Sequence, residues 1–173
     1  MVAIAIIAIV ATIVVPNLTK RSAVEERKAF IGRLTALTQL SAQRAIESGK
    51  VHRVSFNLTK QLIILSVASD KKDDKGIPEF QSPKGYQLNT TLKIPKNLVF
   101  KNFYVDGIDE MARHGGRGTE EVWFYVLPQG VAQSVIINIA DTSDKLDGKN
   151  NQIGLVLNPF NAHFKEYDTF QKP

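Results

Sequence analysis

The sequence predicts an α+β fold in which one long N-terminal α-helix packs on a mostly antiparallel β-sheet domain. Apolar residues recur about every 3.6 positions between Pro16 and Gly49 and at every second position in residues 51–58, which indicates a helix followed by strands. Short apolar runs separated by Gly, Pro and charged residues fill the second part of the chain. We therefore expect an apolar helical part (residues 1–16), an amphipathic helical part (17–49) and a globular β domain (50–173).

The first third of the helix, residues 1–16, contains no charged side chain. A helix that is apolar on every side lies in lipid or in a protein core. At about 1.5 Å per residue, the stretch before Pro16 gives about 22 Å of helix, whereas the hydrocarbon core of a bilayer is about 30 Å thick. Three interpretations follow: a signal peptide, a buried helix, or a transmembrane helix whose beginning lies upstream of Met1. The signal peptide is disfavoured because no basic residue precedes the apolar run. The residues expected to form the membrane helix are Val2, Ile4, Ile6, Ile7, Ile9, Val10, Ile13, Val14 and Pro16.

After Pro16 the helical pattern becomes amphipathic. The residues expected to pack on the sheet are Phe30, Leu34, Leu37 and Ala45, and Ile31, Ala42 and Ile46 widen this apolar stripe. Gly49 is a favourable C-terminal stop for the helix. Because proline removes a hydrogen-bond donor, we expect one long helix kinked near Pro16, with two separate helices as the alternative.

The remaining chain is predicted to form strands and turns. Residues 51–58 and 62–67 are expected to form a hairpin whose first strand is half-exposed and whose second is largely buried. Further strands are predicted at 86–94, 98–105, 122–127, 131–140 and 153–157. Pro128-Gln129-Gly130 is interpreted as a tight turn between the strands 122–127 and 131–140. Segments rich in Gly or charged residues are interpreted as loops at 69–76, 115–118 and 141–152.

Composition and charge exclude several classes of function. The chain has no cysteine, so neither a disulfide framework nor a thiolate metal site is available. The net charge of +5 is dispersed, with acidic residues interleaved, so we expect no nucleic-acid partner. The densest basic cluster is interpreted as a solvated helix face near a membrane and consists of Lys20, Arg21, Arg27, Lys28 and Arg33.

No residue pattern predicts catalysis, a cofactor or a metal ion, so we do not expect an enzyme. The three histidines, His52, His114 and His163, stand in unrelated contexts and are interpreted as surface or strand residues. Residues 115–118 are rich in glycine but no Lys-Ser or Lys-Thr follows them, which favours a flexible loop over a phosphate-binding loop. The aspartates of residues 141–147 are spaced three apart, unlike the ligands of an EF-hand. We interpret this segment as a solvated loop, with a calcium site as the alternative.

Two parts of the sequence carry a family resemblance. Residues 2–11 followed by Pro16-Asn17-Leu18 closely resemble the start of type IV pilins and type II secretion pseudopilins. The aromatic strand and Pro-x-Gly turn of residues 122–130, with the apolar run 153–160, are similar to the H class of minor pseudopilins. On this register Met1 lies about six residues inside the mature protein, and these residues would lengthen the helix to about 32 Å. The leader and the methylated first residue of the family would then lie upstream.

The resemblance implies a pilin-like fold and a structural role as a minor pseudopilin of a type II secretion system. Residues 1–16 would then serve assembly as well as membrane insertion. The implied partners are other pseudopilins or pilins, the inner-membrane assembly platform, the lipid bilayer and a secreted substrate. The implied location is the bacterial inner membrane, crossed once, with the globular domain in the periplasm, although the basic residues after the apolar run favour the opposite orientation by the positive-inside rule. The alternatives are a minor pilin of a type IV pilus or DNA-uptake filament, and a membrane-anchored periplasmic binding protein that does not polymerise.

Overall fold

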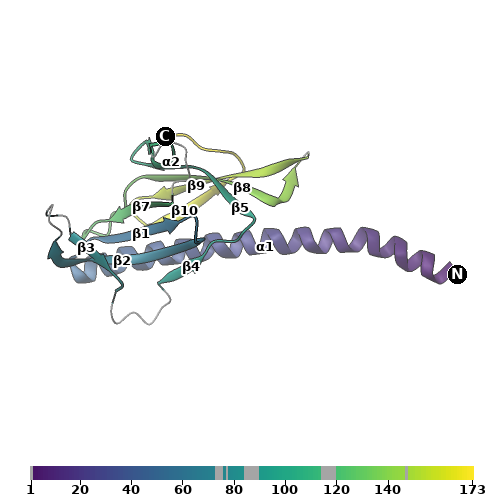
Figure 1. The fold of residues 1–173 in the computed structure, drawn as a ribbon, viewed down its shortest axis with the longest axis horizontal. Helices are drawn as coiled ribbons and strands as arrows, with labels where there is room; N and C mark the ends of the chain where they lie inside the picture. The colour runs from purple at the N-terminus through teal and green to yellow at the C-terminus, as the bar shows by residue number, and fades with distance from the viewer. Residues whose placement is uncertain (1, 73–75, 77, 84–89, 114–119, 147) are drawn as a thin grey trace.

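A computed structural model describes the backbone of residues 2–72, 76, 78–83, 90–113, 120–146 and 148–173, with side chains described from residue 24 onward (Figure 1). The described residues form a long helix, a short helix and ten strands. Their bounds are α1 Val2–Ser48, β1 His52–Asn57, β2 Leu62–Lys72, β3 Pro78–Gln81, β4 Thr91–Lys93, β5 Leu98–Val105, β6 Ile108–Asp109, α2 Glu110–Arg113, β7 Glu121–Val126, β8 Val135–Leu146, β9 Lys149–Asn158 and β10 His163–Tyr167.

The strands form two antiparallel sheets. The first sheet has the order β3-β2-β1-β7, and β4 pairs with β2 beside β3. The second sheet has the order β10-β9-β8-β5-β6. Every strand pair of the two sheets is antiparallel, which confirms the predicted α+β fold with an antiparallel β domain.

Helix α1 runs without interruption through Pro16, so the alternative of two separate helices is wrong. A proline removes one hydrogen bond and bends a helix, but it does not end one when the residues on both sides favour the helix. Figure 1 shows the helix curving in its N-terminal part. At the other end Gly49 has a φ of +63°, and its N–H donates to the Ala45 carbonyl at 3.0 Å, which confirms the predicted stop.

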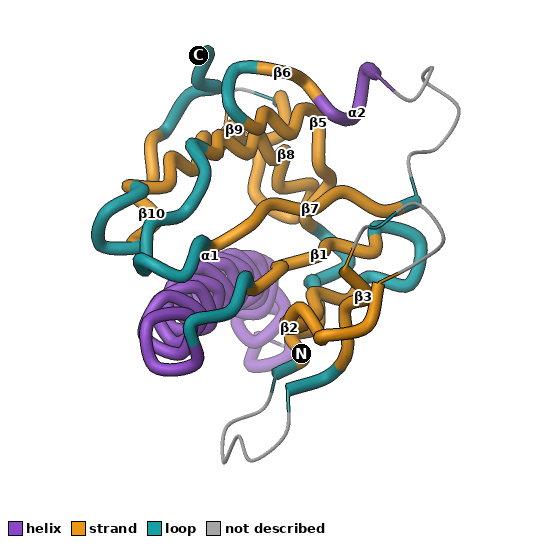
Figure 2. Tube along the Cα trace, turned by 90° about the vertical axis from the view of Figure 1, so that its left-hand side faces the viewer, coloured by secondary structure: helices purple, strands orange, loops and turns teal. Residues whose placement is uncertain are grey.

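One core lies between the helix and the two sheets. Helix α1 contacts β1 and β7 of the first sheet as well as β8 and β10 of the second (Figure 2). Phe30, Leu34, Leu37 and Ala45 are all buried within the core cluster. Ile46, predicted to belong to the same stripe, is instead 61% exposed, although the neighbouring Ala45 is fully buried.

Four fully buried phenylalanines connect the two sheets. Phe56 of β1 meets Phe103 of β5 edge to face, with ring centroids 5.0 Å apart. Phe56 also lies 6.2 Å from Phe124 of β7, which in turn meets Phe164 of β10 at 6.4 Å. Such pairs add about 0.5–1.5 kcal/mol each beyond the area they bury. The two sheets therefore form one rigid unit on which the helix rests.

The first hairpin differs from its prediction in burial and length. Strand β1 lies between β2 and β7, so it is the more buried strand of the hairpin rather than a half-exposed one. Strand β2 extends to Lys72, through residues interpreted as a loop, because β3 pairs with its second half. Of the strand predicted at 86–94, only β4 is described as a strand, and residues 84–89 lie outside the described part.

The second sheet contains one larger correction. Residues 141–146 belong to β8 and residues 149–152 to β9, so the predicted loop 141–152 is mostly a long hairpin. The sequence of residues 141–152 lacks the alternation of apolar and charged residues that predicts a strand. Hydrogen bonding between β8 and β9 nevertheless extends both strands through this segment. The turn at Pro128-Gln129-Gly130 is confirmed by the Gly130 N–H, which donates to the Leu127 carbonyl at 2.8 Å. The two strands that it joins, β7 and β8, belong to different sheets.

We expect Phe56→Ala to lower the free energy of unfolding by about 4 kcal/mol, because a fully buried ring shared by both sheets is replaced by a cavity. Phe160→Ala is the matched control, since that ring is 82% exposed and its loss should change stability by less than about 0.5 kcal/mol. Chemical denaturation followed by circular dichroism measures both. Equal stability of the two variants would contradict the assignment of Phe56 to the junction of the sheets.

Candidate functional site

Helix α1 has two distinct parts in space. From Arg27 to Ala45 one face is buried against the sheets, whereas the N-terminal part projects beyond both sheets (Figure 1). The side chains of residues 1–23 lie outside the described part of the chain, so the predicted membrane and assembly role of residues 1–16 stays a prediction. Within the described residues, no helix is apolar over a length sufficient to cross a bilayer.

A buried ion-pair cluster attaches the helix to the second sheet. Arg27 Nη1 donates to Asp141 Oδ2 at 3.1 Å and to Asp144 Oδ2 at 3.0 Å, and both aspartates lie on β8. Arg27 Nε lies 3.4 Å from Glu166 Oε1 of β10. The side chain of Arg27 is 8% exposed and that of Asp141 is fully buried. We call these four residues the Arg27 cluster.

Neighbouring polar groups complete the Arg27 cluster. The second oxygen of Asp141 accepts hydrogen bonds from Asn97 Nδ2 at 3.0 Å, from the Ser143 hydroxyl at 2.6 Å and from the Ser143 N–H at 3.0 Å. Asp144 Oδ2 also accepts from Asn151 Nδ2 of β9 at 2.9 Å. A buried charge is costly unless it is both paired and hydrogen-bonded, and Asp141 meets both conditions.

In the Arg27 cluster, burial disfavours the charged forms of the side chains, and hydrogen bonds with their partners oppose this effect. Burial disfavours the charged guanidinium, but hydrogen bonds to Asp144 and Asp141 outweigh it and raise the pKa of Arg27. Burial likewise opposes ionisation of Asp141, yet the bonds from Ser143, Asn97 and Arg27 lower the pKa of Asp141 below its ordinary value. Both partners therefore remain charged at neutral pH.

The interpretation of Arg27 as part of a solvated basic face is wrong. Arg27 precedes Phe30 by three positions and Leu34 by seven, so helical spacing places it on the buried stripe. A basic residue on the buried face of a helix requires a buried acidic partner elsewhere in the chain. The position of Arg27 on the apolar stripe was therefore the sequence signal for this ion pair. Asp141 directly follows the buried run of β8 and supplies that acid. Of the interpretation of residues 141–146 as a solvated loop, the loop is wrong, because the segment pairs with β9, and Asp141 is buried, whereas most of the following side chains are exposed.

The histidines and the aspartates considered as metal ligands or catalytic groups do not form a common site in the described residues. Asp141 and Asp144 share Arg27, Asp147 lies outside the described part, and no group of three or more His, Asp or Glu suited to a metal ion occurs where side chains are described. His163 is exposed on β10, and His114 lies outside the described residues. His52 is fully buried on β1. Burial lowers the pKa of His52, although the contact of its Nδ1 with the Lys50 carbonyl at 3.1 Å opposes this effect.

An apolar surface lies at the end of the domain where α1 terminates. Its three exposed side chains are Ile46 (61% exposed), Leu127 (43%) and Phe160 (82%). The segments that carry them are neighbours: a Cβ at Gly130 would lie 2.6 Å from Ile46 Cδ1, and the Ala132 N–H donates to the Pro159 carbonyl at 2.9 Å. We call this surface the distal apolar end.

Comparison with known proteins identifies the fold. No protein-family model matches the sequence, and no curated protein matches it. A structure of the minor pseudopilin EpsH from the type 2 secretion system of Vibrio cholerae aligns over 87% of this chain and 99% of its own, with a TM-score of 0.52 and 17% identity. A second structure of that pseudopilin aligns over 92% of this chain and 99% of its own, with a TM-score of 0.49 and 18% identity. The first alignment confirms the predicted pilin-like fold.

We expect Arg27→Ala to lower the free energy of unfolding by about 3 kcal/mol, because it leaves the buried carboxylate of Asp141 without its cation. Arg33→Ala on the exposed face of the same helix is the control and should change stability by less than about 0.5 kcal/mol. In the double variant Arg27→Ala/Asp141→Ala part of the loss should be recovered. Denaturant unfolding of the full chain measures all three, and additive losses would contradict direct coupling.

Acid should destabilise the fold in two separate steps. The folded-state pKa of His52 is lowered, so its contribution is complete above its ordinary pKa of about 6.5 and is lost as the pH falls below that value. The lowered pKa of Asp141 acts in the same direction, but its contribution begins to fall only below about pH 4.

Thermal melts between about pH 7 and pH 3 test this prediction. The variant His52→Gln should remove the first decline and Asp141→Asn should reduce the second. A melting temperature of the wild-type chain that is constant down to about pH 5 would contradict the assignment to His52.

Proposed function

We propose that this chain is a structural subunit, a minor pseudopilin, of a type II secretion pseudopilus. The observation that carries the proposal is the shape of the molecule: a helix attached to a rigid β domain along one part and projecting beyond it along the other (Figure 1). The projecting part carries the apolar sequence of residues 1–16. The fold shared with EpsH over most of both chains supports the same assignment.

The proposed mechanism uses the similarity of two apolar environments. An apolar helix is stable in the bilayer, and it is equally stable when packed against other apolar helices in the centre of a filament. Transfer between the two environments therefore costs little free energy, so an assembly platform in the inner membrane can drive it. The chain would cross the inner membrane once through a helix that includes residues 1–16 and would place its β domain in the periplasm. The role is structural rather than enzymatic.

The distal apolar end is the proposed contact with the next pseudopilin or with a secreted substrate. Ile46 lies in the last turn of α1, and Figure 1 shows this end of the helix opposite its projecting N-terminal part. Leu127 and Phe160 belong to segments next to that turn. A subunit that enters a filament through its N-terminal helix presents this end toward the tip. Exposed aromatic and aliphatic side chains at one position are typical of protein contact surfaces.

Cysteine crosslinking in the bacterium of origin tests the proposal directly, because the chain has no cysteine of its own. We expect Ile9→Cys to crosslink to cysteines placed in the N-terminal helices of neighbouring pseudopilins. Lys149→Cys, exposed at the β8–β9 hairpin, is the control for random collision and should not crosslink to those helices. Deletion of the gene should retain secreted proteins in the periplasm, and the wild-type chain should restore their export.

Other results of these experiments would support the alternative functions, a minor pilin or an anchored binding protein. Loss of pili or of DNA uptake with normal secretion would identify a minor pilin. A protein that fractionates with the membrane and never crosslinks through Ile9→Cys would identify an anchored binding protein. Either outcome overturns the proposed role in type II secretion.

A further inference from the structure

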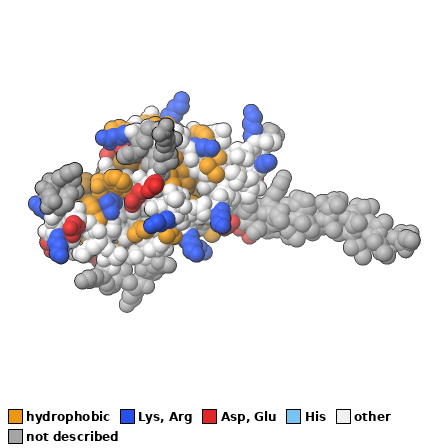
Figure 3. Space-filling view, viewed as in Figure 1, with side chains coloured by type: hydrophobic (Ala, Val, Ile, Leu, Met, Phe, Trp, Pro, Cys, Tyr) orange, Lys and Arg blue, Asp and Glu red, His pale blue; other side chains and the backbone are white. Residues whose placement is uncertain are grey.

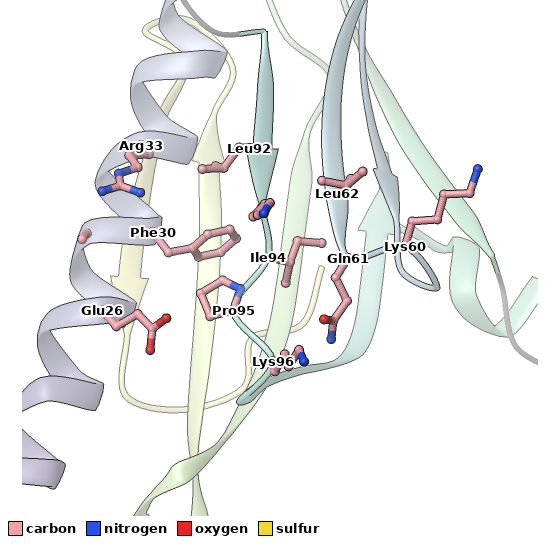
Figure 4. A pocket seen from close by; sticks show the side chains of 12 residues that line it. Glu26, Phe30, Arg33, Lys60, Gln61, Leu62, Leu92, Ile94, Pro95 and Lys96 are labelled. Atoms are coloured by element: carbon pink, nitrogen blue, oxygen red, sulfur yellow. The ribbon is translucent and has the colours of Figure 1, made fainter.

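A groove runs along helix α1 on the side facing β4. Its first part, about 710 Å³, lies between α1, the β1–β2 turn and the segment following β4 (Figure 4). Its second part, about 530 Å³, continues along α1 to Leu40. The two parts share Arg33, Leu92 and Lys93, so they form one groove. From Ala29 to Leu40 its length along the helix is about 16 Å.

The groove has an apolar floor and a basic rim. Phe30 and Ile94 are buried at its base, and Leu92 and Pro95 are half-buried beside them (Figure 4). Four exposed cations border it, namely Arg33, Lys60, Lys93 and Lys96. In the space-filling view, Lys and Arg side chains gather over β4 and the adjacent part of α1 (Figure 3).

The positive charge of the rim is not neutralised by the described part of the chain. None of the four cations forms an ion pair with a described residue. Glu26 is the single acidic side chain among the residues that line the groove. An anionic ligand would therefore gain attraction from four cations and repulsion from one carboxylate.

The backbone of β4 supplies a second means of recognition. Strand β4 pairs with β2 on one side, and no other described strand pairs with it. The Ile94 N–H donates to the Gln61 carbonyl at 2.9 Å, so the alternation of an antiparallel pair turns the N–H and C=O groups of Lys93 away from β2. Figure 4 shows α1 on that side. An extended segment in the groove can bond to this edge, as in strand addition.

We propose that this groove binds an acidic peptide segment of a partner protein, in which apolar residues contact the floor and carboxylates contact the four cations. The inference goes beyond the proposed filament role, and only its preference for a peptide over lipid rests on the membrane helix of that role. The crosslinks through Ile9→Cys test the filament role separately, because they report on a different part of the molecule. Anionic lipid is the competing ligand. The groove runs parallel to α1, so in a chain whose helix enters a bilayer it extends away from the membrane surface, which favours a peptide.

Fluorescence anisotropy with the full chain in a non-ionic detergent tests the groove. The probe is a labelled synthetic peptide of about ten residues in which Glu and Val alternate. We expect saturable binding that weakens at least tenfold in Lys60→Glu/Lys93→Glu, because two attractive charges become repulsive. The control Lys101→Glu/Lys149→Glu makes the same change of net charge at exposed positions outside the groove and should bind like the wild type.

Three results would overturn the proposal. The first is no binding of the probe to the wild-type chain. The second is an equal loss of affinity in the groove variant and the control variant, which would indicate attraction by net charge alone. The third is displacement of the peptide by short-chain phosphatidylglycerol added to the micelles at matched charge, which would assign the groove to lipid. Circular dichroism melts of each variant establish that it is folded.

Discussion

The ion pair between Arg27 and Asp141 determines how the long helix sits on the rest of the molecule. Both side chains are withdrawn from water, and a buried charge is tolerated only with its partner in one geometry. Rotating α1 about its axis, or sliding it by one turn, would separate Arg27 from Asp141, Asp144 and Glu166 together. Apolar packing alone tolerates small slips of a helix, whereas this cluster does not. We infer that it defines the rotation and the position of the helix.

The phenylalanine contacts between the two sheets extend the effect of this ion pair to the whole β domain. Phe56 and Phe124 from the first sheet meet Phe103 and Phe164 from the second, so the sheets do not move independently. The Arg27 cluster binds the helix to β8 and β10 of this unit. A rigid domain held at a defined rotation on a projecting helix transmits the orientation of that helix to every surface of the domain. This property suits a subunit that must present its surfaces in a fixed direction.

The same rotation of α1 decides which residues border the groove. With Arg27 turned toward β8 and β10, Phe30 and Leu37 contribute to both the core and the groove, and Arg33 faces β4 across it. The helix therefore separates two electrostatic environments. On one side a single cation is surrounded by three carboxylates, and on the other side four cations have one carboxylate among them.

Local sequence patterns determined those helices and strands whose signals lie within a few neighbouring residues. The helical period and Gly49 set the end of α1, and the run 98–105 coincides with β5, because both signals are contained in a few neighbouring positions. Tertiary structure alone decided the rest. Arg27 and Asp141 are 114 positions apart, β7 and β8 diverge into different sheets after one turn, and residues 141–146 become a strand because β9 pairs with them. In each case the stabilising partner is distant in sequence, and no local pattern identifies it.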